Sequence, residues 1–346
     1  MDEPSPGARR MWELTRTFPE QLREGWRAGR EVAPGLPAFG GVHLFGMGGS
    51  GIAGEYLAQL GSAQDSHPVR SSREASLPRW LAPDTLVVVL SYSGDTWEAL
   101  HVYREAGRRG LPRALVSAGG ELTRMGRSQG VPIVRIPGGR PPRASLGLLF
   151  GGLAGLLPAL LPPGEEMERV AGSLESRAGE LFAEDGPAAG LARRASGKEL
   201  WTYVPEPLAP VGRRWKDNLE ENAKELSHFD TIPELLHNAI VAWDTLPPGE
   251  SPKQFVTLLE AADSPPETRW EVAYLEQELR KRSVPVERVR PGIPGLLAGL
   301  LELSWFGDVV SLFRAREKGV DPIVMEGIVK MKAARKASSG ERTPIT

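Results

Sequence analysis

The apolar positions of the first 140 residues form short runs separated by amphipathic or glycine-rich segments. Residues 85–90 read TLVVVL without alternation, which is typical of a strand buried on both faces. Residues 41–45 predict another short strand, and residues 95–109 an amphipathic helix. Further strands are expected at 68–73, 113–117 and 131–136, and further helices at 11–30 and 50–60. Strands separated by helices of this length favour a parallel sheet with crossover connections.

The same alternation restarts in the second half of the chain. After a charged stretch at 165–198, strands are expected at 199–204, 254–260 and 284–289, and helices at 269–282, 296–316 and 323–336. We therefore predict an α/β protein with two three-layer αβα domains and mainly parallel sheets. The first domain would span residues 1–160 with a helical lead-in, and the second residues 161–346 with a C-terminal helix.

Residues 144–161 form an uncharged run of about 18 residues, the lower limit for a helix that crosses a membrane. The run contains four glycines and Pro158. We interpret it as a buried helix between the domains and expect no membrane association. The N-terminus lacks the apolar core of a signal peptide, so we expect a cytoplasmic protein.

Composition narrows the possible chemistry. The chain has no cysteine, which excludes thiol nucleophiles, disulfides and thiolate metal sites. Its five histidines include no pair at i, i+4, so we expect neither a metal nor another cofactor. With 42 Lys+Arg against 44 Asp+Glu, the net charge of −2 gives no electrostatic sign of nucleic-acid binding.

A glycine loop, GMGGSG at residues 46–51, joins a predicted strand to a predicted helix. The free N–H groups at a helix N-terminus favour an anion there. The loop also fits G-x-G-x-x-G, the pattern of dinucleotide-binding folds. That interpretation requires an acidic residue about 20 positions on, and Glu74 lies late for it. An NAD(P)-binding oxidoreductase and a purely structural turn both stay open at this point.

A second strand–loop–helix junction reads SYSGDT at residues 91–96. Ser91, Ser93 and Thr96 can each donate to a phosphate oxygen, although a single one of them would be explained as a helix N-cap. Loops at the carboxyl ends of neighbouring parallel strands converge on one crevice. The pair of loops therefore favours a compact phosphate monoester over a dinucleotide.

GMGGSG followed about 40 residues later by SYSGDT resembles the sugar isomerase (SIS) domain. This resemblance implies that Ser50, Ser91, Ser93 and Thr96 hold a sugar phosphate, together with Gly48 and Gly49. Asp95 stands where the family more often has asparagine. Because an inward carboxylate would repel a phosphate dianion, we expect Asp95 to face a helix end or solvent.

Segments across the whole chain resemble the bifunctional phosphoglucose/phosphomannose isomerase family, which has two SIS domains. The family patterns N-E-N-A-K and P-E-L-N-H-N-E correspond to EENAK at 220–224 and PELLHN at 233–238. Three further stretches match in order: IPGGRPPRAS at 136–145, GVDP at 319–322 and IVKMK at 328–332. The resemblance implies a homodimer with shared active sites, in which a histidine reaches in from the neighbouring subunit.

The resemblance also implies catalytic roles in aldose–ketose isomerisation through a cis-enediol. Glu221 matches the base that moves the proton between C2 and C1, and Arg143 the cation beside the enediolate. His237 matches the residue that opens the sugar ring. Lys332 matches a C-terminal lysine that assists ring opening, with Lys330 as the alternative if the register slips by two.

The expected function is interconversion of glucose 6-phosphate, and of mannose 6-phosphate, with fructose 6-phosphate, without a metal. Leu236 and Ala239 replace polar family residues beside His237, which could alter its hydrogen-bonding partner. A non-catalytic SIS protein that only binds a phosphosugar therefore stays open as an alternative.

Overall fold

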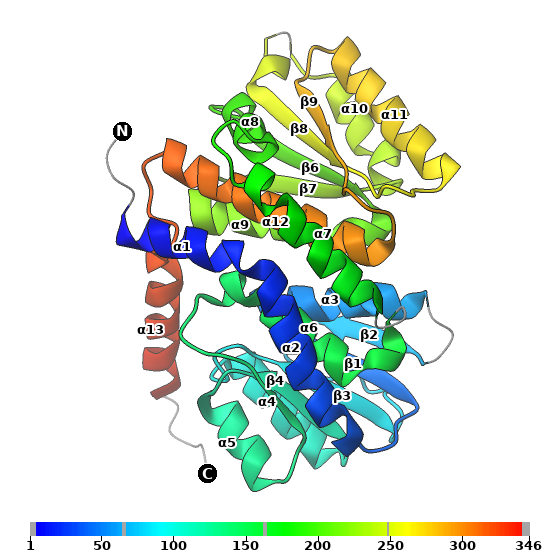
Figure 1. Ribbon diagram of the computed structural model, residues 1–346, viewed down its shortest axis with the longest axis vertical. Helices are drawn as coiled ribbons and strands as arrows, with labels where there is room; N and C mark the ends of the chain where they lie inside the picture. Colours follow the sequence, from blue (N-terminus) through cyan, green and yellow to red (C-terminus); the bar gives the residue numbers. More distant parts are fainter. Residues whose placement is uncertain (1–4, 64–66, 162–164, 248, 341–346) are drawn as a thin grey trace.

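The computed structural model describes residues 5–63, 67–161, 165–247 and 249–340, and two parallel sheets organise them (Figure 1). The five-stranded sheet of the first half has the order β2-β1-β3-β4-β5, and the four-stranded sheet of the second half the order β7-β6-β8-β9. Every strand pair in both sheets is parallel. This architecture confirms the predicted α/β class with mainly parallel sheets.

The first sheet lies between two layers of helices. Its strands are β1 (Gly41–Gly46), β2 (Val69–Ser72), β3 (Thr85–Leu90), β4 (Arg113–Ser117) and β5 (Ile133–Arg135). Alternate residues of β3 enter different cores: Val88 packs in the cluster with α2 (Phe18–Val32), α3 (Gly48–Ser62) and α6 (Leu146–Leu156), whereas Val89 packs with α4 (Trp97–Arg108) and α5 (Gly120–Ser128). Burial of both faces explains the unbroken apolar run of β3.

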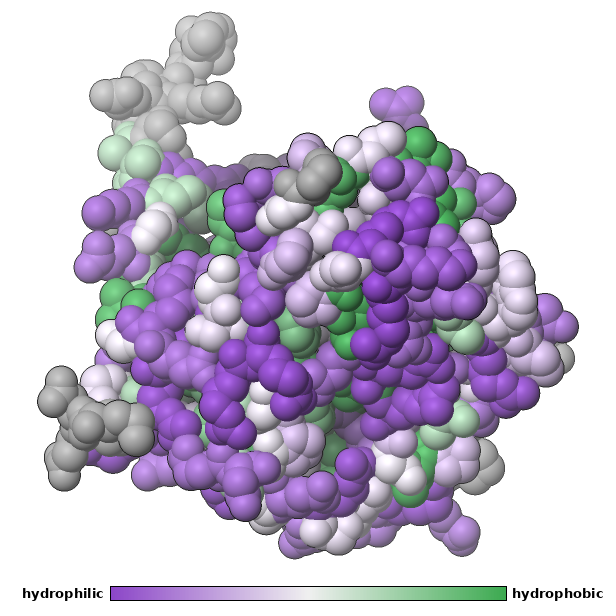
Figure 2. Space-filling view, turned by 90° about the horizontal axis from the view of Figure 1, so that it is seen from above, coloured by the Kyte–Doolittle hydropathy of each residue, from purple (hydrophilic) through white to green (hydrophobic). Residues whose placement is uncertain are grey.

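The second sheet repeats this three-layer arrangement. Its strands are β6 (Glu199–Pro205), β7 (Ser227–Ile232), β8 (Gln254–Leu259) and β9 (Val286–Val289). One face packs on α8 (Pro187–Arg194), α9 (Ala209–Asn218) and α12 (Leu296–Glu317), and the other on α10 (Ala239–Asp244) and α11 (Pro266–Lys281). Most of the face seen in Figure 2, which looks down on this half, is hydrophilic.

The two halves share a continuous hydrophobic core and exchange helices. The same cluster includes Val88 of β3 and Leu259 of β8. The N-terminal helix α1 (Pro6–Arg16) packs on α12 of the second half, where Trp305 donates its indole N–H to Thr15 O at 2.7 Å. Helix α7 (Glu165–Leu181) contacts both α2 and α12, while α13 (Glu326–Gly340) runs down beside the first half (Figure 1).

The short helical turns are η1 (Ala33–Gly35), η2 (Pro142–Ser145), η3 (Pro158–Leu160), η4 (Glu206–Leu208), η5 (Leu219–Ala223), η6 (Glu234–His237) and η7 (Ser251–Lys253).

Several sequence expectations need correction. The single lead-in helix at 11–30 is two helices, α1 and α2, which meet at Thr17. The buried helix expected over 144–161 is α6 alone, and the chain then turns at Pro158 in η3. Strand β7 was not predicted, because it is an edge strand in which four half-buried residues separate two buried ends. Its sequence therefore lacks the apolar run that marks β3.

Glycines in α6 allow its backbone to lie in direct contact with the backbone of α2. A Cβ at Gly151 would lie 2.4 Å from Leu22 O, and one at Gly155 would lie 2.2 Å from Trp26 O. All residues of α6 are buried.

Among the described helices, α12 is the one long and apolar enough to cross a membrane, and 89% of its most apolar window is buried inside the protein.

The α2–α6 contact can be tested with two matched substitutions. Gly151→Ala should destabilise the protein by about 1–3 kcal/mol, because the methyl group would overlap backbone that cannot move aside. Gly172→Ala in α7 is the control: its Cβ would meet no atom within 4 Å, so alanine's helix propensity should leave stability equal or higher by up to about 1 kcal/mol. Thermal denaturation measures both, and equal melting temperatures would contradict this account.

Candidate active site

Four hydroxyl side chains meet at the carboxyl edge of the first sheet. Ser50 lies in the first turn of α3, after β1, and its Oγ accepts a hydrogen bond from Tyr92 N at 3.3 Å. Ser91 directly follows β3, and its Oγ accepts from Gly94 N at 3.1 Å and lies 3.4 Å from Thr96 Oγ1. Ser93 Oγ lies 3.5 Å from the same Thr96 oxygen. Since β1 and β3 are neighbours, the two predicted loops do converge; we call Ser50, Ser91, Ser93 and Thr96 the hydroxyl cradle.

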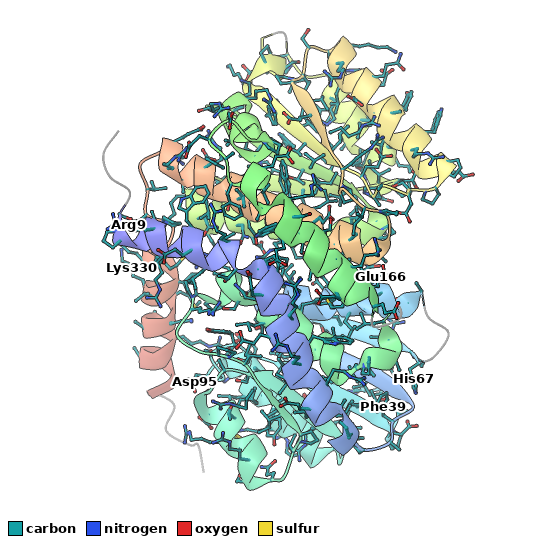
Figure 3. The ribbon with its side chains drawn as sticks, viewed as in Figure 1. Arg9, Phe39, His67, Asp95, Glu166 and Lys330 are labelled. Atoms are coloured by element: carbon teal, nitrogen blue, oxygen red, sulfur yellow. The ribbon has the colours of Figure 1, made fainter. Side chains whose placement is uncertain are left out.

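The backbone around this cradle suits an anion. Helix α3 begins at Gly48, whose φ of +53° favours glycine, and Thr96 is the N-cap of α4. Two helix N-termini with their free N–H groups therefore border the hydroxyls. Asp95 turns away from them, because its Oδ1 accepts from Glu121 N at 2.8 Å in the first turn of α5, which is the helix-end orientation predicted from the sequence (Figure 3).

Glu221 and Arg143 form an ion pair between the two halves. Helix α9 continues into η5, a π-helical turn that carries Glu221, and η2 carries Arg143 just before α6. Glu221 Oε2 lies 3.4 Å from Arg143 Nη1. The structure thus brings together two predicted residues that are far apart in the sequence. Single π-helical turns frequently occur at functional sites.

The Arg143 guanidinium is buried, with 7% of the side chain exposed, and is held on all sides. Its Nε donates to Asn222 Oδ1 at 2.7 Å, and its Nη2 donates to Pro322 O. Its own carbonyl accepts from Arg214 Nη2 at 2.9 Å, and the same Arg214 nitrogen donates to Asp308 Oδ2 at 2.6 Å. Arg143 is therefore a fixed positive charge beside Glu221.

The ion pair adjoins the hydroxyl cradle. Pro142 O lies 3.3 Å from where a Cβ of Gly49 would be, and Arg143 Cα lies 3.6 Å from it. The turn that carries Arg143 thus packs directly on the first turn of α3, one residue from Ser50. A ligand with an anionic end in the cradle would extend its other end toward Glu221 and Arg143.

The surroundings of the Glu221 carboxyl shift its pKa. The pKa of Glu221 is raised above its ordinary value of 4.5, chiefly by burial; Arg143 opposes the rise, and Asp217 adds to it. Burial also raises the pKa of Asp217. A carboxylate with a raised pKa beside a fixed cation can accept a proton and return it, which general acid–base catalysis requires.

The structure does not bring His237 to Glu221 within one chain. Glu221 precedes the first residue of β7, whereas His237 is exposed and ends η6, beyond the last residue of β7. The strand runs from Ser227 to Ile232, a length of about 17 Å. The two residues thus lie at opposite ends of β7. Leu236 and Ala239, which replace polar family residues, pack against the core under β7.

The C-terminal lysines interact with carboxylates other than Glu221. Lys332 is exposed on α13, and its charge interacts with Glu98 in the first turn of α4. Arg335, one turn on, donates to Glu98 Oε1 at 2.6 Å and lies over the Trp97 ring. Lys330 pairs with Glu326 of its own helix at 3.8 Å (Figure 3). The interaction with Glu98 thus places Lys332 near the start of α4, where Thr96 of the cradle is the N-cap.

The lysine that the structure does place at Glu221 was missed from the sequence. Lys224 closes the EENAK segment, and its Nζ donates to the Glu221 carbonyl oxygen. Its position in the motif, three residues after the candidate base, was the available signal.

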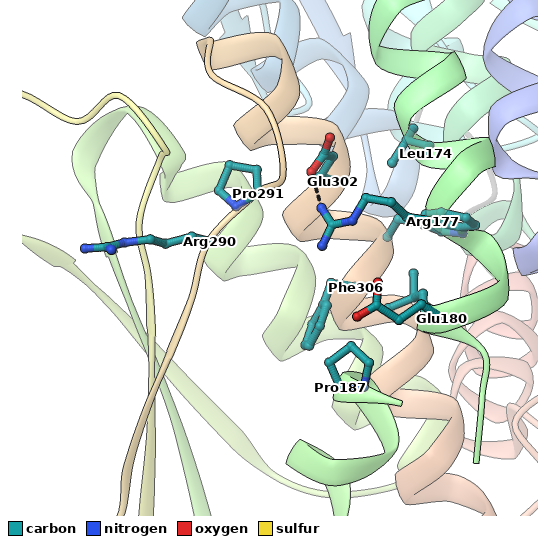
Figure 4. A pocket seen from close by; sticks show the side chains of 10 residues that line it. Leu174, Arg177, Glu180, Pro187, Arg290, Pro291, Glu302 and Phe306 are labelled. Atoms are coloured by element: carbon teal, nitrogen blue, oxygen red, sulfur yellow. Dashed lines mark hydrogen bonds and ion pairs between the residues drawn. The ribbon is translucent and has the colours of Figure 1, made fainter. Parts of the chain in front are cut away.

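A separate cavity of about 30 Å³ lies between α7, α8 and α12 (Figure 4). Its charged lining includes Arg177 and Glu302, which pair at 2.9 Å, and its apolar lining includes Trp305 and Phe306. None of its lining residues belongs to the cradle or to the Glu221–Arg143 pair.

Known proteins resemble this chain in sequence and in fold. Residues 184–334 match the family model described as the bacterial phospho-glucose isomerase C-terminal SIS domain. A bifunctional phosphoglucose/phosphomannose isomerase of Caldicellulosiruptor bescii is 27% identical over 93% of this chain and 98% of the relative. The protein of the same name from Aeropyrum pernix is 31% identical over 67% of this chain and 70% of the relative. A solved structure of a hypothetical protein from Thermus thermophilus superposes with a TM-score of 0.76 at 16% identity, over 96% of this chain and 93% of that chain.

The fold and the site together define a protein of the SIS class, with two SIS-type α/β sheets in one chain. Within that class, the chain belongs to the bifunctional phosphoglucose/phosphomannose isomerase family.

The raised pKa of Glu221 can be tested through stability. A carboxyl whose pKa is higher in the folded than in the unfolded state stabilises the fold at low pH, and this contribution is lost as pH rises through the folded pKa. The glutamine side chain of Glu221→Gln stays neutral. The melting temperature of this variant minus that of the wild type should therefore increase as pH rises from about 4 to 7. Asp95→Asn, at an exposed helix end, is the control. A relative loss of stability with rising pH would show that the charged form of Glu221 is favoured.

Proposed function

We propose that this protein is an aldose–ketose isomerase that interconverts glucose 6-phosphate, and mannose 6-phosphate, with fructose 6-phosphate in the cytoplasm. It would act without a metal, through a cis-enediol intermediate, in two SIS domains of residues 1–160 and 161–346. The observation that carries the proposal is the Glu221–Arg143 pair, 3.4 Å apart, in which Arg143 lies on the turn that packs against the hydroxyl cradle.

Each part of the site would take one part of the substrate. The hydroxyl cradle and the helix N-termini, with Gly48 and Gly49, would hold the phosphate group. Glu221 would remove the proton from C2 of the open-chain aldose and return it to C1, while the oxygen on C1 gains a proton and the hydroxyl oxygen on C2 loses one. The buried Arg143 charge would stabilise the enediolate between these transfers. The raised pKa of Glu221 supports a group that can both accept and return a proton.

Ring opening would require a second subunit. His237 is exposed at the end of β7 remote from Glu221, so a single chain leaves the candidate base without the candidate imidazole. A homodimer in which His237 of one chain enters the site of the other would complete it. Lys332, near the start of α4, would assist the opening and bind the substrate.

A coupled assay tests the enzyme claim. Purified protein should convert fructose 6-phosphate to glucose 6-phosphate, and should turn over mannose 6-phosphate, equally well with and without a chelator. No turnover of either substrate above blank would overturn the proposal in favour of a non-catalytic phosphosugar-binding protein. Loss of turnover on chelation would contradict the metal-free mechanism, and stimulation by NAD(P) would revive the dinucleotide interpretation.

The cradle predicts a separable effect on substrate binding. Ser91→Ala combined with Ser93→Ala removes two phosphate donors without touching Glu221, so KM for fructose 6-phosphate should rise by about 10-fold or more while kcat changes little. Ser128→Ala, an exposed serine at the end of α5, is the matched control. A fall in kcat at unchanged KM would mean that these hydroxyls act in the chemical step.

Shared active sites predict complementation between two inactive proteins. Glu221→Gln should lower kcat by at least about 10²-fold, the low end of general-base contributions, and His237→Ala should lower it for ring-closed substrate. After the two variants are unfolded and refolded together, half of the dimers are mixed, and each has one site with both native residues. About a quarter of the wild-type activity should return. Failure to recover activity, with mixed dimers shown by mass spectrometry, would place Glu221 and His237 in the same chain's site.

A further inference from the structure

Lys224 has a backbone conformation that lysine rarely adopts. It follows the last residue of η5 with φ 56° and ψ 38°, in the left-handed region. Among the described residues, Ser283 with φ 60° is the one other non-glycine residue at positive φ. A side chain destabilises this conformation, and glycine removes the cost. Residues with a strained backbone cluster at active sites, so this conformation marks Lys224 as a candidate functional residue.

The Lys224 side chain lies among the charges of the candidate active site. Its Nζ donates to the carbonyl oxygen of Glu221, and its charge interacts with Glu221, Arg143 and Asp321. Burial, and next the nearby Arg143 charge, lower the pKa of the Lys224 ammonium. The residue as a whole is nevertheless exposed, so a ligand can reach it.

Lys224 offers hydrogen-bond donors that are more accessible than those of Arg143. All three nitrogens of Arg143 face protein atoms: Nε faces Asn222, Nη2 faces Pro322 O and Nη1 faces Glu221. An ammonium carries three N–H donors, and within the described part of the chain Lys224 uses one of them. The buried Arg143 is thus a charge held in place by protein atoms, while the exposed Lys224 keeps two accessible donors for a bound molecule.

We propose that Lys224 is a further catalytic residue, whose ammonium contacts the oxygens on C1 and C2 of the open-chain sugar phosphate and stabilises the enediolate. This inference rests on the proposed function. The hydroxyl cradle holds the phosphate end, so the reacting carbons lie at the Glu221 end, where the Lys224 ammonium is. The alternative role is that of a structural cap, since a lysine can satisfy a carbonyl at a helix end without any ligand.

The strained backbone allows a test that separates the two roles. Lys224→Gly removes both the ammonium and the steric cost, so it should raise the melting temperature by roughly 1–3 °C and yet lower kcat for fructose 6-phosphate by at least about 10-fold, with KM little changed. Ser283→Gly is the matched control: it relieves the same strain between α11 and β9, away from the site, and should raise the melting temperature without changing kcat. Lys224→Arg should keep more activity than Lys224→Met, because arginine retains the charge.

A binding measurement makes the result independent of turnover. Calorimetry would compare 5-phosphoarabinonate, whose carboxylate resembles the charged enediolate, with glucitol 6-phosphate, which is uncharged at that end. Lys224→Gly should weaken binding of the aldonate by about 10-fold or more and leave binding of the polyol phosphate unchanged.

The outcomes distinguish this inference from the proposed function. Unchanged kcat and unchanged aldonate affinity in Lys224→Gly would overturn the inference and leave Lys224 as a cap, while an active wild type would still support the isomerase. An inactive wild type would instead overturn the proposed function, and selective loss of aldonate binding in Lys224→Gly would still establish contact at the reacting end.

Discussion

The buried guanidinium of Arg143 is the constraint on which the geometry of this site depends. Arg143 belongs to the first half of the chain by sequence, yet its partners Asn222 and Pro322 belong to the second half. A buried charge is costly unless its surroundings satisfy it, so the two halves can pack only in an arrangement that supplies these partners. That arrangement also sets Glu221 beside the charge and places the turn of Arg143 on the first turn of α3.

A second buried cation supports the first. Arg214 bridges the carbonyl of Arg143 and the carboxylate of Asp308, which also accepts from Asn218. Burial raises the pKa of Asp308, and Arg214 opposes that rise. Buried ion pairs contribute little net stability compared with apolar packing, but removing one partner leaves an uncompensated charge. This network therefore matters most for fixing the position of Arg143, and it connects the candidate active site to the long core helix α12.

The sequence was informative where a residue's role follows from its neighbours along the chain. The apolar run of β3 and the glycines before α3 predict their own conformation, and adjacent parallel strands dictate that the loops after them meet. The Glu221–Arg143 contact has no such local signal, because 78 residues separate the two, and only family resemblance suggested it. The polar edge strand β7 escaped prediction, and with it the opposite placement of Glu221 and His237. The left-handed backbone conformation of Lys224 could not be predicted from the sequence either, because residues other than glycine rarely adopt it.

The four-stranded sheet has the same order as the first four strands of the five-stranded sheet, but different side chains follow its strands. In the second sheet, β8 lies beside β6 as β3 lies beside β1. The residue directly after β3 is Ser91, whereas the residue directly after β8 is Glu260, which is fully buried and pairs with Arg288 at 3.3 Å and Arg290 at 2.7 Å. At the edge of the second sheet, the Glu260 carboxylate thus occupies the position that the Ser91 hydroxyl occupies in the first. The second half contributes Glu221 from η5 instead, so the hydroxyl cradle and the carboxylate of the candidate site come from different halves, which pack together through Arg143.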